Sequence, residues 1–138
     1  MTKQFWLNLP VKDVAKSKAF FAGLGFKFNT QHGNSANSAS LLLGQHNVVL
    51  MLFEEQAFKG FTNNAIANTG QGTEVLLSID AESKEEVDEM ARKAVAAGGK
   101  SGHQPSAMQG WMYGCVFSDL DGHKWNVLYM DMSKMPKG

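Results

Sequence analysis

The side chains of this chain that could do chemistry are few and scattered. Its single cysteine, Cys115, lies inside an apolar stretch with no histidine beside it in sequence, which favours a buried thiol over a nucleophile. Asp119 and Asp121 lie in a predicted turn, where aspartate is favoured for hydrogen bonds to its own backbone. The four histidines form neither an i, i+4 pair nor an HxH motif, and we expect them to be solvated; they are His32, His46, His103 and His123.

Two asparagines matter more, because each interrupts an alternating apolar stretch. In residues 124–130 the large rings fall on one face of a predicted strand, and Asn126 falls on the other. In residues 5–11, Asn8 shares a face with Trp6. An amide in a strand is compatible with an edge position as well as with a binding site. Which face of each strand turns inward depends on a one-residue register, and the pattern leaves that open.

The elements that would position these side chains follow one order in the first half of the chain. Asp13 can cap a helix over residues 13–24, which Gly25 ends. Pro10 closes the strand before that helix. Apolar stretches broken by Asn, Ser and Gly predict the strands, which are residues 5–11, 26–30, 39–43 and 48–53.

The second half predicts the same order again. Ser83 and Glu86 have capping-box spacing at the start of a helix that ends at Gly98 and Gly99. An Asp-Gly pair, Asp121-Gly122, predicts the tight connection of a β-hairpin. The strands are predicted at residues 73–79, near 100–104, at 111–117 and at 124–130.

The repeat predicts an α+β fold of two tandem βαβββ modules within one domain, residues 1–138. Module one covers about 1–55 and module two about 72–131, with a short C-terminal tail. The connecting segment, about 56–71 within Glu54 to Gly72, lacks clear periodicity and is a linker or lid candidate, or its phenylalanines close the core. Each module has one helix on one sheet face, so we expect the two curved sheets to enclose a shared cavity.

The composition limits the kinds of partner that we expect this protein to bind. Lys plus Arg and Asp plus Glu number 13 each, so formal net charge is zero and neither nucleic acid nor an anionic membrane is an expected partner. Hydrophobic residues make up 43% of the chain, as in folded globular proteins. No signal-peptide pattern occurs and no stretch approaches the ~18 apolar residues of a membrane-spanning helix. We therefore expect a cytoplasmic protein.

Three stretches together resemble the vicinal oxygen chelate superfamily, which includes glyoxalase I, bleomycin-resistance proteins and extradiol dioxygenases. They are FWLNLPVKDVAKSKAFFAGLGFKF, GTEVLLSIDAESKEEVDEMARKAVAAGG and GWMYGCVFSDLDGHKWNVLYMD. More narrowly, they are similar to bacterial proteins described as predicted lactoylglutathione lyases. The resemblance covers nearly the whole chain, is specific to a fold rather than to a reaction, and implies a homodimer.

The resemblance also implies where a metal would be held, because metal-dependent members take ligands from the first and last strands of each module. These positions here are Asn8, Met51, Glu74 and Asn126, and related sequences usually have Glu where Asn126 stands. Divalent cations prefer carboxylates and imidazoles, and only one carboxylate is offered. We therefore predict no metal and no other cofactor.

What remains is a predicted pocket for a small organic molecule, lined by Trp6, Asn8, Met51, Glu74, Trp111, Tyr113 and Asn126. The same residues could instead be ordinary core. In such a pocket without a metal, Glu74 would be a candidate general base with a raised pKa. The favoured hypothesis is a metal-free binding protein. The alternatives are a divalent-metal lyase or isomerase of lactoylglutathione lyase type, in which Glu74 would move a proton, and a structural module without a ligand.

Overall fold

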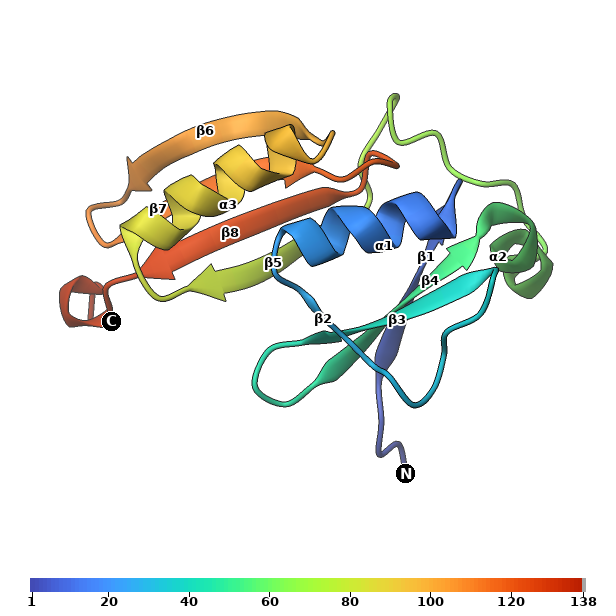
Figure 1. Ribbon diagram of the computed structural model, residues 1–138. Helices are drawn as coiled ribbons and strands as arrows, with labels where there is room; N and C mark the ends of the chain where they lie inside the picture. The colour runs from blue at the N-terminus through green and yellow to red at the C-terminus, as the bar shows by residue number, and fades with distance from the viewer. Residues whose placement is uncertain (138) are drawn as a thin grey trace. The chain divides into compact units, whose positions relative to one another are not determined.

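The computed structural model describes residues 1–137, so residue 138, the last of the predicted domain, lies outside the described part. Two compact units are present, Met1–Asn68 and the chain from Thr69 onward, and each contains one four-stranded sheet (Figure 1). The predicted α+β class and the tandem order of elements are confirmed. Within residues 1–137, no helix is both long and apolar enough to cross a membrane.

Module one contains a sheet with strand order β1-β4-β3-β2. Strands β1 and β4 are parallel, and the other neighbours are antiparallel. Its elements are β1 (Trp6–Val11), α1 (Val14–Gly23), β2 (Lys27–Phe28), β3 (Ser38–Leu43), β4 (Val48–Glu54) and α2 (Glu55–Thr62).

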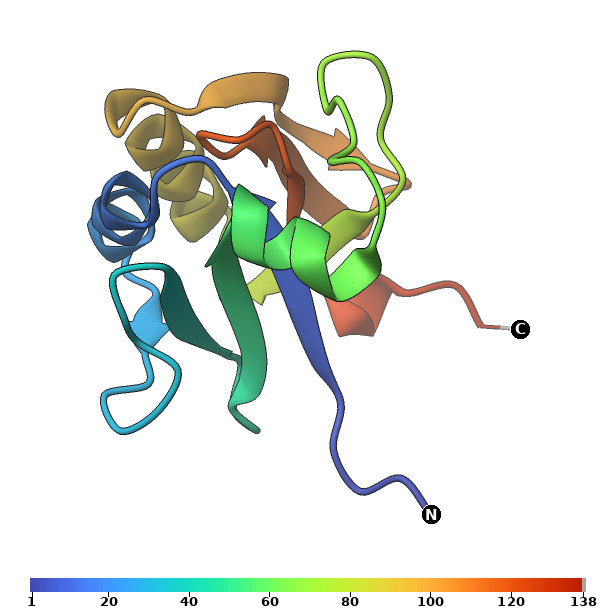
Figure 2. The same ribbon diagram turned by 90° about the vertical axis from the view of Figure 1, so that its right-hand side faces the viewer.

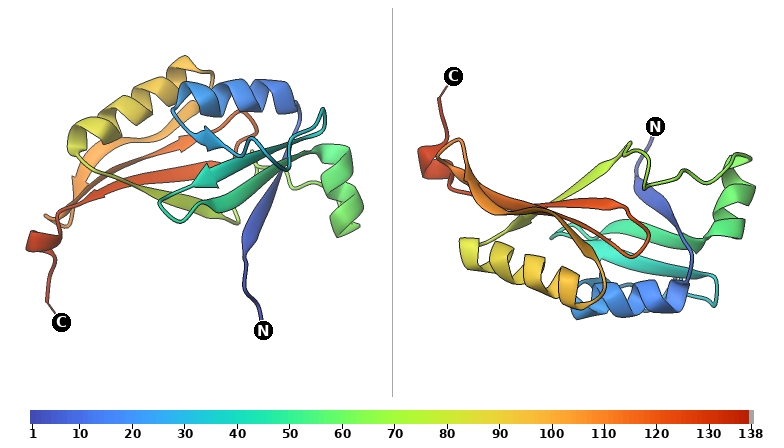
Figure 3. Two further views of the ribbon diagram at one scale, coloured as in Figure 1. Left: turned by 60° about the horizontal axis from the view of Figure 1, so that its bottom comes forward. Right: turned by 90° about the horizontal axis from the view of Figure 1, so that it is seen from above.

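Helix α1 covers one face of this sheet, as Figure 3 shows. The predicted cap is confirmed, since the Asp13 carboxylate accepts a hydrogen bond from the Lys16 backbone N–H at 3.0 Å. Phe20 and Phe21 of the helix are buried, as are Leu9 and Val11 of β1. Side chains of a strand alternate between its two faces, so Trp6 and Asn8 lie on the face opposite to Leu9 and Val11. We call this the open face of module one.

Two predicted elements of module one differ in the structure. Strand β2 is shorter than residues 26–30, because the Asn29 side chain accepts hydrogen bonds from the backbone of Gln31 and His32 and turns the chain away. The segment predicted as a linker or lid begins with helix α2, which contacts β1 and β4 (Figure 2). Phe61 of α2 packs edge-to-face on Phe53, with ring centroids 5.0 Å apart. This contact fixes the helix on its own module.

Module two repeats the topology with strand order β5-β8-β7-β6. Strands β5 and β8 are parallel, and the remaining pairs are antiparallel. Its elements are β5 (Leu76–Ala81), α3 (Lys84–Ala96), β6 (Lys100–Met108), β7 (Met112–Ser118), β8 (Lys124–Met130) and the 3₁₀ helix η1 (Met132–Lys134).

Two strand boundaries here were predicted wrongly. Strand β5 begins at Leu76 instead of residue 73, because Leu76 pairs with Lys124, the first residue of β8, and no partner strand precedes it. Strand β6 extends to Met108 instead of ending near 104, since β7 pairs with it along its length through two irregularities. Pro105 is tolerated in β6 because that strand lies at the sheet edge.

Helix α3 packs on one face of the second sheet (Figure 3). Its predicted cap is confirmed, with the Ser83 hydroxyl accepting from the Glu86 N–H at 3.1 Å. The large rings of the hairpin lie in this core, where Phe117 and Trp125 stack with centroids 6.2 Å apart. Asn126 therefore lies on the other face, the open face of module two.

The hairpin predicted between β7 and β8 is confirmed, and its turn is organised by one carboxylate. Asp119 is 5% exposed and accepts three hydrogen bonds, from the backbone N–H groups of Asp121 and His123 and from the Trp125 indole. Gly122 has a φ of +83°, and a Cβ there would collide with the Thr69 side chain. Both the aspartate and the glycine of the turn are thus structural.

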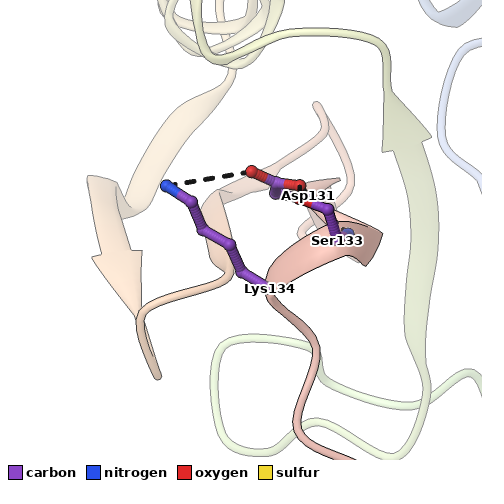
Figure 4. Close-up of polar contacts among 3 residues, drawn as sticks. All are labelled: Asp131, Ser133 and Lys134. Atoms are coloured by element: carbon purple, nitrogen blue, oxygen red, sulfur yellow. Dashed lines mark hydrogen bonds and ion pairs between the residues drawn. The ribbon is translucent and has the colours of Figure 1, made fainter.

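The chain after β8 is held by a second aspartate. The Asp131 carboxylate caps η1 by accepting from the Ser133 hydroxyl at 2.6 Å and its N–H at 3.1 Å (Figure 4). Lys134 lies 3.8 Å from the other carboxylate oxygen. The Asp131 N–H also donates to the Trp111 carbonyl at 2.8 Å, which ties the C-terminal end to the β6–β7 turn.

Candidate functional site

The open face of module one carries a cross-strand row of polar and thioether side chains. Asn8 of β1 pairs with Met51 of β4, and Met51 pairs with Ser40 of β3. The next row along the strands contains Trp6 and Val49. Because paired residues point to the same face, these side chains form one continuous surface. Ser40 is buried, whereas Trp6 is 53% exposed.

The loop between β2 and β3 folds over part of this surface. A Cβ on Gly33 would meet the Ser40 Cβ at 2.8 Å and the Met51 sulfur at 3.0 Å, and its φ of +80° also favours glycine. Asn34 holds the loop there, since its Oδ1 accepts from the Ser40 N–H at 3.2 Å and its Nδ2 donates to the His32 carbonyl at 3.1 Å. The loop therefore needs glycine at this position to reach the sheet.

Beside this contact lies a pocket of ≈ 590 Å³. Its apolar lining includes Phe5, Trp6, Val49 and Met51, and its polar lining includes Lys3, His32 and His46. The volume falls within the range of about 300–1,000 Å³ that is usual for small-molecule sites. Aromatic and methionine walls with a few polar groups are typical of such sites.

Asn8, which does not itself line this pocket, has an unusual feature. Its Oδ1 atom is buried and has no hydrogen-bond partner among the described residues. Leaving a buried acceptor unpaired costs about 1–3 kcal/mol, so a buried polar atom normally finds a partner. Asn8 shares its row with Met51, which lines the pocket.

The equivalent row in module two is internally satisfied. Asn126 pairs with Ser78, and its Nδ2 donates to the Ser78 hydroxyl oxygen at 3.1 Å. Asn8 therefore corresponds to Ser78 in strand pairing, and Glu74 does not take that place as predicted. Glu74 lies before β5 in an exposed segment. Glu74 is therefore not a carboxylate within a pocket, as its predicted role of general base requires.

The aromatic residues of module two that were predicted to line a pocket do not lie on its open face. Tyr113 pairs with Tyr129 on the face that packs on α3, and its hydroxyl donates to Asp88 of that helix at 2.6 Å. This hydrogen bond is the main cause of a raised Tyr113 pKa. Trp111 lies in the turn before β7, and its indole N–H is buried without a partner among residues 1–137.

The single thiol is a core group, as predicted. Cys115 is 2% exposed, and burial raises the pKa of its thiol to about 11. Its Sγ lies 3.9 Å from the Val87 carbonyl oxygen in the interface with α3. A nucleophilic cysteine needs a lowered pKa and access to solvent, and Cys115 has neither.

The donor set does not fit a catalytic divalent cation. In module one the positions are an amide and a thioether, Asn8 and Met51, and in module two they are Ser78 and Asn126, which bond to each other. A hard or borderline cation prefers several carboxylate or imidazole ligands. Within residues 1–137, no group of three or more His, Cys, Asp or Glu side chains is arranged to hold a metal ion.

Several residues of this site were not predicted from the sequence. Lys3, His32 and His46 carry no local signal, because they come from the N-terminal segment, a loop and a turn that only the folded module brings together. Ser40 had a weak signal, since it alternates with apolar residues in β3. Ser78 likewise stands among apolar residues of β5, opposite Asn126.

A comparison with protein families shows the class to which this chain belongs. The family model described as Glyoxalase/Bleomycin resistance protein/Dioxygenase superfamily matches residues 3–127. The chain therefore belongs to this superfamily, and the predicted family resemblance is confirmed. No curated protein sequence matches the chain significantly.

Several solved structures are similar to this chain. The chain is similar to hypothetical protein SA1046 from S. aureus, with 32% identity over 94% of this chain and 95% of that one and a TM-score of 0.83. It shares its fold with a lactoylglutathione lyase from Agrobacterium tumefaciens, at 18% identity, 99% coverage of each chain and a TM-score of 0.66. TioX from Micromonospora sp. ML1 also shares the fold, at 16% identity over 94% of this chain and 99% of that one, with a TM-score of 0.63.

Proposed function

We propose that this protein binds a small organic molecule on the open face of module one and needs no metal to do so. The observation that carries the proposal is the ≈ 590 Å³ pocket with its aromatic and methionine walls. The row of Met51 also contains Asn8, whose buried Oδ1 has no partner among the described residues. An acceptor without a partner costs stability, and a ligand that donates to it recovers that cost. The thioether and amides at the superfamily's ligand positions support the metal-free part.

Trp6 supplies a direct test, because it lines the pocket and is 53% exposed. The probe is N-phenyl-1-naphthylamine, a neutral aromatic molecule with one N–H donor. We expect it to bind saturably and to quench tryptophan emission. Trp6→Phe should remove most of this quenching.

Trp111→Phe is the matched control, because Trp111 lies in module two. It should leave the quenching unchanged. The proposal would be overturned if the quenching disappeared in Trp111→Phe and persisted in Trp6→Phe, or if the probe did not bind at all. In a purely structural module the pocket would be filled by the protein's own side chains, and the probe would not bind.

The competing function is a divalent-metal lyase of lactoylglutathione lyase type. It is supported by the shared fold with the Agrobacterium enzyme and not by the donor set. Elemental analysis of protein purified without chelator separates the two. A stoichiometric divalent ion that is lost in Asn126→Ala would favour the lyase.

We also propose a homodimer. The support is a pair of exposed apolar residues at the edge strand of module two, Val75 just before β5 and Leu76 at its start. Unpaired strand edges with apolar side chains tend to be covered by another chain. Light scattering at micromolar concentration should give twice the chain mass of 15.1 kDa, and a monomer would contradict the proposal.

A further inference from the structure

The charged and polar groups at the pocket of module one are distributed unevenly. The side chains around it that can carry a positive charge are Lys3, His32 and His46, and none of the lining residues is an aspartate or glutamate. All three are exposed, whereas the floor contains Met51 and Val49, which are partly buried. The pocket therefore has an apolar floor and a rim that attracts anions.

Lys3 is the strongest contributor to this rim. Other lysines among the described residues have carboxylate partners, such as Lys93 with Glu89 and Lys134 with Asp131, whereas Lys3 forms no such ion pair within residues 1–137. The chain as a whole has a formal net charge of zero. The positive rim is therefore a local feature and does not follow from the overall composition.

We infer that the ligand is an amphipathic anion: an aromatic or aliphatic body that packs on Trp6, Val49 and Met51, with an acidic group at the rim beside Lys3. This inference rests on the proposed function and specifies its ligand class. The acidic group stays partly solvated, because Lys3 is exposed. Holding the charge at the rim avoids the cost of burying an unpaired ion.

Two probes with the same body test this inference. 8-Anilinonaphthalene-1-sulfonate carries the anilinonaphthalene body and its N–H together with a sulfonate, and N-phenyl-1-naphthylamine lacks only the sulfonate. At low ionic strength we expect the sulfonate to bind about threefold to fivefold tighter than the neutral probe, the range of one partly exposed ion pair. This preference should shrink in 0.5 M salt, about where screening shortens the Debye length below 5 Å.

Variants at Lys3 locate the charge effect. Lys3→Gln should remove most of the preference and Lys3→Glu should reverse it, while the neutral probe keeps its affinity for all three proteins. Lys16→Gln is the matched control, because Lys16 lies on α1, which packs on the other face of the same sheet, and the net charge changes equally. It should leave both affinities unchanged.

The outcomes separate this inference from the proposed function. If both probes bind equally well, or if Lys16→Gln weakens the sulfonate as much as Lys3→Gln does, the anion assignment is overturned and the pocket stands. If neither probe binds and Trp6 emission does not change, the proposed function itself fails. Sulfonate binding of unchanged affinity in Lys3→Glu would place the acidic group away from Lys3 and overturn the assignment.

Discussion

The two modules share one topology and differ in how their open faces treat polar groups. In module one, Asn8 keeps a buried acceptor without a partner beside a pocket. In module two the corresponding pair, Ser78 and Asn126, satisfies itself. Repeated folds can thus divide their tasks. One copy retains an unsatisfied acceptor, and the other pairs the side chains at the same positions with each other.

Module two also contains the groups whose pKa values are strongly affected by burial. Burial raises the pKa of the Asp119 carboxyl, although the nearby His123 and the hydrogen bonds from Trp125 and the turn backbone act in the opposite direction. Asp119 and Cys115 are both buried and engaged inside this module. We read these titratable groups as structural rather than catalytic.

The largest effect should follow from Asp119→Ala, which leaves the Trp125 indole N–H and two backbone N–H groups of the turn without their acceptor. We expect a loss of about 3 kcal/mol in the free energy of unfolding, the magnitude for hydrogen bonds to a buried charged group. Urea denaturation measures it. Asp119→Asn keeps one acceptor oxygen and should cost less. Unchanged stability in Asp119→Ala would contradict the structural role of Asp119 in module two.

Thiol labelling compares the interiors directly. With a pKa raised to about 11 from 9.0, Cys115 has about a hundredfold less thiolate near pH 8 than an ordinary cysteine, and burial slows reagent access further. Native protein should therefore react with a disulfide reagent at least a hundredfold more slowly than unfolded protein.

A thiol placed in module one supplies the contrast. Met51→Cys, made together with Cys115→Ser, puts the thiol on the pocket lining. It should react readily in the native state and be protected by the neutral naphthylamine probe. Equally slow reaction of the two thiols would show that the pocket is closed to solvent.

Two substitutions in the polar rows should change stability by smaller amounts and in opposite directions. Asn8→Leu removes the unpartnered acceptor and should raise the free energy of unfolding by about 1 kcal/mol while weakening the naphthylamine probe. Ser78→Ala removes a satisfied hydrogen bond, and should lower stability by about 1 kcal/mol without affecting the probe. Calorimetry and fluorescence titration measure both. Destabilisation by Asn8→Leu would mean that Asn8 is also structural.

The smallest effect concerns the cap of η1. Hydrogen bonds from Ser133 lower the Asp131 pKa, so the cap is fully present above the ordinary carboxyl pKa and is lost as pH falls through the lowered value. The Ser133 amide resonance should therefore titrate at a pH below that of an unperturbed aspartate, about 3.9. In Asp131→Asn this titration should vanish, with no change in probe binding at neutral pH.

Local patterns in the sequence determined most of the elements. The caps at Asp13 and Ser83, the Asp-Gly turn and the period-two stretches of β1 and β8 each depend on residues close together in the chain. The family resemblance followed from these stretches as well. The same local patterns placed Cys115 in the core.

Pairing between distant strands decided the rest. Only the buried alternation of each sheet shows that Asn8 and Asn126 lie away from the helices and that Tyr113 faces α3. Only the registry of β5 with β8 sets Ser78, and not Glu74, opposite Asn126. A shift of one residue would exchange the two faces of a strand at no local cost, so the choice rests with the packing of the whole module. The pocket of module one depends on such packing, because its lining comes from the N-terminal segment, three strands, a loop and a turn.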